Sequence, residues 1–493
     1  MGSIGSYQTY ISSGDINNKN MTDFLLNTNI GQLNKKNIKR NINKIVNKLK
    51  EISIDKNRHQ YLCLSCIFGA FLGDSIGSSC EFCQPSSNNH KAIFSGNDEV
   101  FYPGEITDDS EMAISAAFAY MDVLNEDPSN LQNLIYYYFC IWLNSEPKDM
   151  GNATSNALKN WKRESIEITK FNYEYIKKIN WNTLANGFLM RISTFIVFYY
   201  YSHLDNIYNI IERYFKTENT ELTEEIINLY LDIYYESSIN TEITHPNYEN
   251  GISSAVYTLM TLTGMVTNDA SKVYLLFKII TKSQNFIKCH KDNIENHLAF
   301  KIQEKYEKII KEVESNNITS VFNEIGYYIH GFKLTIYNIK MLADMGKNID
   351  NEIYYKIMCY ICDLNGDTDT NCAIVGGMIG PLIGYKNFNK TCFDIFINFI
   401  PKQRCQYNSP FMYIYVNYLE KKFINEKYKW KIKKEKDDKN EKDNIKGGNK
   451  ESSQGNNNNI EIKDINDENN KNEKFKYAAF TQIKKFLFED MNI

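Results

Sequence analysis

Apolar residues recur at helical spacing through most of this 493-residue chain, and this periodicity limits the possible folds most. From about residue 58 to residue 430, apolar runs are separated by short polar or glycine-containing breaks, and alternating strand patterns are scarce. Proline, which breaks helices, occurs only 8 times. The pattern therefore predicts an all-α protein. The clearest predicted helices cover residues 60–73, 109–124, 131–144, 185–204 and 354–362.

Composition divides the chain into a globular domain with extensions on both sides. We expect a polar and basic N-terminal extension at 1–57, a compact domain at 58–430, a low-complexity segment at 431–474 and a C-terminal helix within 475–493. Residues 282–318 are charged and show few core anchors, so we interpret them as an inserted or lengthened helical hairpin.

The N-terminal extension ends in a basic run with one apolar face. Its apolar residues recur at helical spacing and are Ile38, Ile42, Ile45, Val46 and Leu49. The first residues match the N-myristoylation pattern at Gly2, for which the basic run could supply a second membrane signal. We favour a leader followed by a solvated helix, because such short patterns are common by chance.

Other bulk features predict an intracellular, cytoplasmic protein. We expect no membrane span, because the nearest candidate, 188–201, is short and contains Arg191. The 11 cysteines are scattered through apolar stretches, as expected for reduced thiols rather than a disulfide framework. The net charge of −4 excludes a generally basic nucleic-acid binder, so no nucleic-acid partner is predicted. We expect a monomer.

Two acidic clusters of similar make-up each begin a predicted helix of small residues. They are Thr107-Asp108-Asp109 and Asp367-Thr368-Asp369-Thr370. Helix capping accounts for one such cluster but does not explain a second of the same make-up. Carboxylate and hydroxyl oxygens are the ligands that hard divalent cations prefer. We predict that the two helix N-termini converge, with cations between acids that would otherwise repel each other.

Glycines in the helix after Asp369 indicate how that convergence arises. Gly376, Gly377 and Gly380 would allow close packing against a neighbour, for which the helix after Asp109 is the candidate. An EF-hand beginning at Asp367 is excluded, because Cys372 stands where that loop requires glycine.

A zinc site is the rival metal hypothesis. Cys63, Cys66, Cys80 and Cys83 have the spacing C-x2-C-x13-C-x2-C, which is close to that of zinc ligands. The first pair lies inside an apolar helical run, however, and buried free cysteines behave as small apolar residues. We therefore favour the reading without zinc.

Further segments offer groups that bind ligands. Glu81 follows a glycine-rich helix end, where a solvated glutamate would need no function. The Gly/Ser/Thr loop at 151–155 leads into a helix, an arrangement whose backbone amides bind phosphate. Asn186 and Arg191 offer an amide and a guanidinium at a helix start. His245 alone would be interpreted as a capping or core histidine.

Taken together, these motifs resemble the ADP-ribosylglycohydrolase family over roughly residues 60–425. The matching segments, in family order, are GAFLGDSIGSSCEF, GEITDDSEMA, GNATSNAL, NGFLMRI, THPN, Gly326-Tyr327-Tyr328 and NGDTDTNCAIVGGMIGPLIG. The resemblance implies a compact all-α fold with a binuclear Mg²⁺ (or Mn²⁺) site. It also implies hydrolysis of the C1″ bond that joins ADP-ribose to a protein side chain or small acceptor.

The same resemblance assigns roles to individual residues. The implied metal-binding set is Thr107, Asp108, Asp109, Asp367, Asp369 and Thr370. The implied catalytic residues are Glu81, Asp108 and Asp109. Gly151, Asn152, Ala153, Thr154 and Ser155 would approach the diphosphate, and Asn186 and His245 the surrounding pocket. Two alternatives stay open: a catalytically inactive relative that binds ADP-ribose, and a Mg²⁺-dependent phosphohydrolase.

Overall fold

The computed structural model describes most of the globular part of the chain. The described residues are 35–81, 101–159, 171–431 and 478–491, apart from short gaps at 291–292, 319–320, 322, 347–349, 402–403, 405 and 490. Gly2 and nearly all of the low-complexity segment lie outside them. Within this part the chain is helical and contains no strand, although an isolated antiparallel bridge joins Ala185 to Tyr327. The all-α prediction is confirmed.

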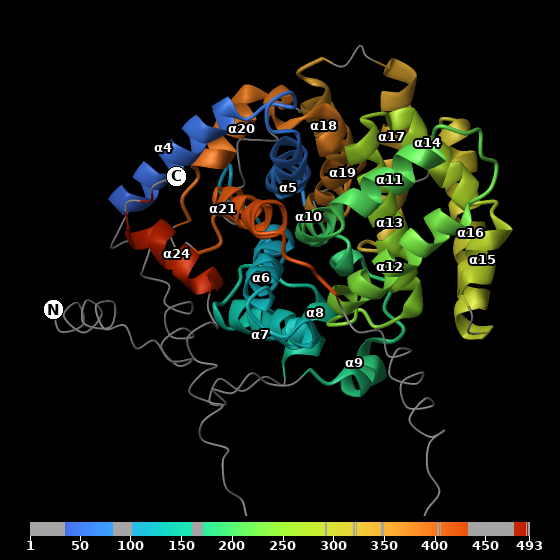
Figure 1. The fold of residues 1–493 in the computed structure, drawn as a ribbon, viewed down its shortest axis with the longest axis horizontal. Coiled ribbons are helices and arrows are strands. Elements are labelled where there is room, and N and C mark those ends of the chain that lie inside the picture. The colour runs from blue at the N-terminus through green and yellow to red at the C-terminus, as the bar shows by residue number, and fades with distance from the viewer. Residues whose placement is uncertain are drawn as a thin grey trace, which may run out of the picture.

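Figure 1 labels the described helices in chain order. They are α4 (Lys35–Glu51), α5 (Arg58–Gly77), α6 (Asp108–Val123), α7 (Leu131–Asn144), α8 (Asn152–Leu158), α9 (Tyr173–Asn180), α10 (Ser193–Ser202), α11 (Leu204–Tyr214), α12 (Glu224–Thr241), α13 (Tyr248–Thr267), α14 (Ala270–Ile280), α15 (Gln284–Cys289), α16 (Asn293–Glu314), α17 (Tyr328–Met345), α18 (Ile353–Leu364), α19 (Thr368–Ile383), α20 (Lys390–Asn398), α21 (Phe411–Glu420) and α24 (Ala478–Phe488).

Helices α5 and α19 form the most extensive helix pair of the described fold. Glycines let their backbones touch: a Cβ added at Gly376 would lie 2.2 Å from the Gly69 carbonyl oxygen, and one at Gly73 would lie 2.3 Å from the Cys372 carbonyl oxygen. A Cβ at Gly380 would lie 2.1 Å from the Ser65 carbonyl oxygen. The glycines of α19 thus permit close packing, but the expected neighbour was wrong, because they face α5 rather than α6.

Helix α5 is also apolar and long enough to cross a membrane by length and composition, contrary to the expectation that no segment is. Its side chains are nevertheless almost all buried inside the protein. The apolar character of α5 is therefore explained by its central position in the core.

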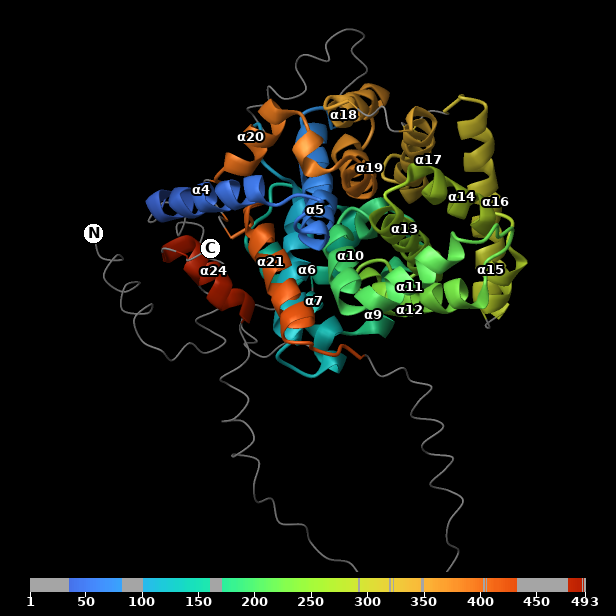
Figure 2. The same ribbon diagram turned by 45° about the horizontal axis from the view of Figure 1, so that its top comes forward.

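The two ends of the described chain pack against each other (Figure 1, Figure 2). The apolar face of α4 is buried, so the expectation of a solvated helix was wrong. Asn41 of α4 donates to the carbonyl oxygens of Phe486 and Glu489, each at 2.8 Å, at the end of α24. Near the start of α24, the Ala479 amide donates to buried Asp122 of α6 at 2.8 Å. Side chains from other helices thus cap both ends of α24.

Two predicted features of the chain need correction. Residues 282–318 form α15 and α16, and the inner face of α16 is well anchored by Ala299, Ile302, Tyr306, Ile309, Ile310 and Val313. Residues 185–204 are not one helix, because the backbone at Ala185 is extended and bridges Tyr327, and Asn186–Phe188 forms a short 3-10 helix. The Asn186 amide donates to the Gly326 carbonyl oxygen at 2.8 Å, so α10 begins only at Ser193.

Candidate metal centre

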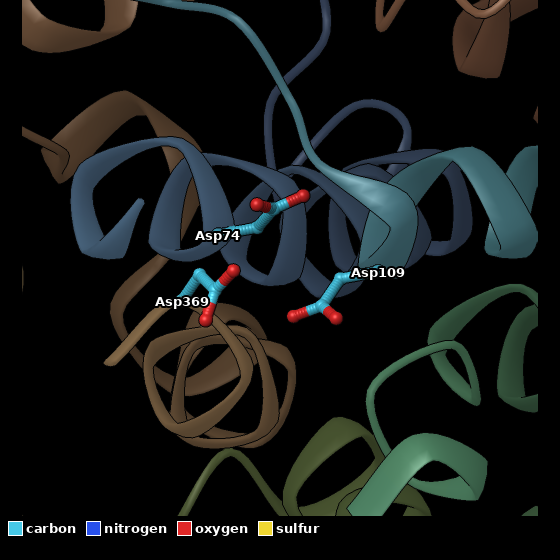
Figure 3. A group of neighbouring side chains, drawn as sticks. All are labelled: Asp74, Asp109 and Asp369. Carbon is cyan, nitrogen blue, oxygen red and sulfur yellow. The ribbon is translucent and has the colours of Figure 1, made fainter. Parts of the chain in front are cut away.

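Three buried carboxylates from three helices meet at the N-termini of α6 and α19 (Figure 3). Asp74 comes from α5, Asp109 from α6 and Asp369 from α19, and each offers an oxygen within 4.8 Å of the other two. Helix α6 starts at Asp108 because Thr107 caps it, accepting from the Asp109 amide at 3.4 Å. Residues far apart in the sequence thus share one site.

A second group of acids adjoins the first. Glu81, Asp367 and Asp369 also offer carboxylate oxygens within 4.8 Å of one another, so Asp369 belongs to both groups. The Thr370 hydroxyl donates to Asp109 Oδ1 at 3.2 Å and joins α19 to α6. Two neighbouring groups of oxygen ligands with one shared carboxylate suit a pair of cations.

Burial and the charges of neighbouring acids raise the pKa values of four carboxyl groups at the site. Burial first, and then the charges of neighbouring acids, raise the pKa of Asp108, Asp109 and Asp369 well above the usual value. Burial, followed by the charges of Asp149, Asp367 and Asp74, raises the pKa of Glu81 to about 8. In the described part of the chain, Asp109 Oδ2 is buried without a hydrogen-bond partner. A divalent cation would satisfy that oxygen and relieve the repulsion, so the residues fit such an ion.

Asp74 is a member of the site that motif reasoning did not select. It is fully buried within α5 and accepts hydrogen bonds from the amides of Thr107 and Ser110, at 3.1 and 3.2 Å, and from the Ser110 hydroxyl. Burial raises the pKa of Asp74 to about 6, although these donors act in the opposite direction. A buried carboxylate needs hydrogen-bond donors or a cation beside it. The presence of an aspartate inside an apolar helix was therefore the sequence feature that could have indicated Asp74.

We expect Asp74→Ala to lower the free energy of unfolding by about 1–3 kcal/mol more than Asp74→Asn does. Alanine leaves the Thr107 and Ser110 amides buried without an acceptor, whereas the asparagine oxygen can still accept from them. Urea unfolding in EDTA measures the difference. Equal stability of the two variants would mean that Asp74 does not hold the start of α6.

Asp149 is a second acid near the site that the sequence motifs did not indicate. Its charge contributes to the raised pKa values of both Asp108 and Glu81, so it lies close to the acidic groups. It directly precedes Met150 and Gly151, and that position beside the predicted phosphate-binding loop was the available signal.

The cysteines of the zinc hypothesis do not gather in the described structure. Cys63 and Cys66 are buried inside α5, and Cys83 lies outside the described residues. Burial raises the pKa of the Cys66 thiol. The potential metal-binding groups found among the described residues consist of carboxylates alone. This set of oxygen donors suits Mg²⁺ or Mn²⁺ better than a thiophilic ion.

The predicted substrate segments lie around the acids to different degrees. Asn186 Nδ2 donates to Asp367 Oδ2 at 2.7 Å, so Asn186 adjoins the second acidic group. Residues 151–155 form the start of α8, two residues after Asp149, and a Cβ added at Gly151 would meet no atom within 4 Å. This helix start is therefore open on the side of Gly151.

His245 and Arg191 are buried and contact the turn at Gly187. His245 is buried, its Nδ1 lies 2.7 Å from the Thr244 hydroxyl, and its ring packs against the turn at Gly187. Burial, and then the charge of Arg191, lower the pKa of His245 well below the usual value, so the ring is neutral. Arg191 does not offer its guanidinium to a ligand as expected. It is fully buried and donates to the Gly187 carbonyl oxygen, to Asn240 and to the Thr244 hydroxyl.

Comparisons with known proteins identify the family of this chain. The family model for ADP-ribosylglycohydrolase matches residues 56–394. A protein of Acanthamoeba polyphaga mimivirus, assigned by name to the ADP-ribosyl glycohydrolases, is 26% identical over 361 residues, covering 69% of this chain and 92% of that protein. The ADP-ribosylarginine hydrolase of Pseudomonas putida (strain GB-1) is 29% identical over 135 residues, covering 27% of this chain and 34% of that enzyme.

A further relative is the ADP-ribosyl-dinitrogen-reductase glycohydrolase of Rhodospirillum rubrum. It is 28% identical over 118 residues, covering 22% of this chain and 37% of that enzyme. The family model spans more than half of the chain, and it includes both acidic clusters and all the segments that surround them. The chain belongs to the ADP-ribosylglycohydrolase family and is a hydrolase of glycosidic bonds.

Proposed function

We propose that this protein hydrolyses the C1″ glycosidic bond of an ADP-ribosylated protein side chain, in a reaction that depends on a pair of Mg²⁺ or Mn²⁺ ions. The observation that carries the proposal is the meeting of the Asp74, Asp109 and Asp369 carboxylates in a buried site. Buried acids at such short range are stable together only if they take up protons or share cations. Their all-oxygen character favours the cations.

The proposed metal ligands come from both acidic groups. They are Thr107, Asp108, Asp109, Asp367, Asp369 and Thr370, with Asp74 added because its oxygens lie within the first group. Ions bound there would orient the ribose hydroxyls and act as Lewis acids toward water. Asp108, with its raised pKa, lies at the same helix start as Asp109 and would release a proton when a cation binds.

Glu81 is the proposed general acid or base. Burial and the neighbouring acids raise the pKa of Glu81 to about 8 when no cation is bound, so its carboxyl can exchange a proton near neutral pH, as this role requires. It lies beside Asp367 and Asp369, next to the proposed cations. In this position Glu81 can give a proton to the leaving group or take one from the attacking water.

The ADP-ribose moiety would extend from the acids across the neighbouring turns. The start of α8 at Gly151–Ser155 is the proposed diphosphate contact, which its position after Asp149 and the open space at Gly151 support. Asn186 would fix the ribose side of the pocket through its bond to Asp367. His245 would line the pocket behind the turn at Gly187.

For the acceptor, we propose an ADP-ribosylated protein, with ADP-ribosylarginine as the first substrate to test. This choice rests on the Pseudomonas putida relative, whose name specifies ADP-ribosylarginine. The Rhodospirillum rubrum relative is named for a protein substrate, dinitrogen reductase.

The test is release of ADP-ribose from a panel of peptides modified on arginine or serine and from small ADP-ribose conjugates. Each is incubated with pure protein in EDTA, Mg²⁺ or Mn²⁺. The proposal expects release from at least one substrate, and only with added metal. Metal-dependent binding of ADP-ribose without turnover would instead support an inactive binding relative, and release of inorganic phosphate from nucleotides would support a phosphohydrolase.

A further inference from the structure

The segment Gly326-Tyr327 forms part of the border of the acidic site. Two backbone hydrogen bonds hold it: the Asn186 amide donates to the Gly326 carbonyl oxygen at 2.8 Å, and the Tyr328 amide donates to the Leu184 carbonyl oxygen at 3.1 Å. A Cβ added at Gly326 would lie 3.6 Å from Asp367 Oδ2. The position of this segment therefore sets the position of the Asn186 backbone. The Asn186 side chain in turn donates to Asp367 and orients its carboxylate.

A lysine from α16 reaches this segment from outside the acidic site. Helix α16 lies on the side of the molecule opposite α4 and α24 (Figure 1, Figure 2). Lys305 forms an ion pair with Glu249 at the start of α13. Its Nζ also lies 5.6 Å from the centre of the Tyr327 ring, within the range of a cation–π contact. The Lys305 side chain is 30% exposed, so these contacts are only partly screened by water.

The partner of Lys305 is itself fixed. Glu249 is buried at the start of α13 and accepts a hydrogen bond from the Tyr328 hydroxyl at 2.8 Å. Lys305 therefore bridges a fixed acid on α13 and the aromatic side chain that follows Gly326. The buried Glu249 charge favours the arrangement in which Lys305 lies beside it, because any other arrangement leaves that charge without a cation.

We propose that Lys305 is a positioning residue of the substrate site. It holds Tyr327, and so the Gly326 backbone, against Asn186 and Asp367, which makes α16 part of the binding machinery rather than an appended hairpin. The effect on substrate binding rests on the proposed function, but the effect on the backbone does not. Substrate affinity should depend on Lys305 more strongly than turnover does, because the ion pair of Lys305 is with Glu249 and not with the proposed metal-binding or catalytic acids.

The experiment compares Lys305→Met, Lys305→Arg and the control Lys278→Met by hydrogen exchange and steady-state kinetics. Lys278 forms the ion pair between α14 and Glu314 of α16, 2.7 Å long and exposed, so its loss loosens α16 without touching Tyr327. In Lys305→Met, we expect amide exchange at Asn186 and Tyr328 to rise about tenfold and KM to rise about tenfold, with kcat within about threefold of wild type. Arginine should largely restore both, and the control should match wild type.

The double variant Lys305→Met/Glu249→Gln guards against misfolding, since it leaves no unpaired buried charge. Wild-type exchange and KM in this variant and in Lys305→Met would overturn the proposal. An equal rise in exchange and KM in the Lys278→Met control would also overturn it, because α16 would then stabilise the site without a specific role for Lys305. If the wild-type protein releases no ADP-ribose, the proposed function fails, and the exchange rates alone decide the role of Lys305.

Discussion

Replacing Asp109 with asparagine should lower the rate of ADP-ribose release by about 10³-fold or more and remove the rise in melting temperature that Mg²⁺ produces. One oxygen of Asp109 already accepts from Thr370, and the other is buried without a donor among the described residues. Asparagine would direct an N–H at the position where a cation is expected. Release assays, and thermal melts with Mg²⁺ and with EDTA, measure both effects.

In EDTA the same variant should behave in the opposite way. Asp109 lies within 4.8 Å of the carboxylates of Asp74 and Asp369, so its neutralisation removes repulsion between buried like charges. We expect the Asp109→Asn protein without metal to be more stable than wild type by about 1–3 kcal/mol at pH 8. A gain in stability together with a loss of activity is typical of a ligand site. The wild-type carboxylates repel one another until the ligand binds, so removing one of them stabilises the empty protein.

The matched control is Asp122→Asn. Asp122 lies on the same helix and is equally buried, but it accepts from the Tyr138 hydroxyl and the Ala479 amide, far from the acids. This variant should lose stability with or without metal and keep its response to Mg²⁺. Wild-type turnover in Asp109→Asn, or a loss of the Mg²⁺ response in Asp122→Asn, would place the metal site elsewhere.

The acidic clusters were predictable from the sequence because each is a local feature. Thr107 caps α6, and the motif at Asp367 leads directly into α19. Both clusters stand at helix N-termini, where acids are favoured even without a ligand. What pointed to a site was the occurrence of two such starts in one chain, and the structure brings Asp109 and Asp369 together.

Other members of the site depend on contacts that no local pattern records. Asp74 belongs to the site because the glycine contacts pack α5 against α19, and because Asp74 accepts from amides at the start of α6. Arg191 was expected to face a ligand, but it is buried and joins the turn at Gly187 to the one at Thr244 through hydrogen bonds. Helix α16 has apolar residues at helical spacing on one face. The many charged residues on its other face made this apolar pattern hard to recognise in the sequence. In each case tertiary packing decided the role of the residue.

The contact between α5 and α19 gives the second large prediction: Gly376→Ala should destabilise the protein by about 3 kcal/mol or more and reduce activity by about 10²-fold. The added Cβ would lie 2.2 Å from the Gly69 carbonyl oxygen and 2.9 Å from its carbonyl carbon. Both are backbone atoms, so the two helices must separate. Because α5 carries Asp74 and α19 carries Asp369, their separation moves the acids apart. Urea unfolding and release assays measure the two effects.

Gly264→Ala is the control for this substitution, because Gly264 is also a buried helical glycine. Its added Cβ would meet Leu382 side-chain atoms at 3.4 and 3.5 Å, which is ordinary contact with a flexible neighbour. Alanine is favoured over glycine inside a helix by about 0.5–1 kcal/mol, so this variant should match or exceed wild-type stability and keep full activity. If the two variants behaved alike, the close backbone contact at Gly376 would not be what holds the acids together. If Gly376→Ala lost stability but kept activity, the site would tolerate a movement of α5 against α19, and the metal ligands would have to come from α6 and α19 without Asp74.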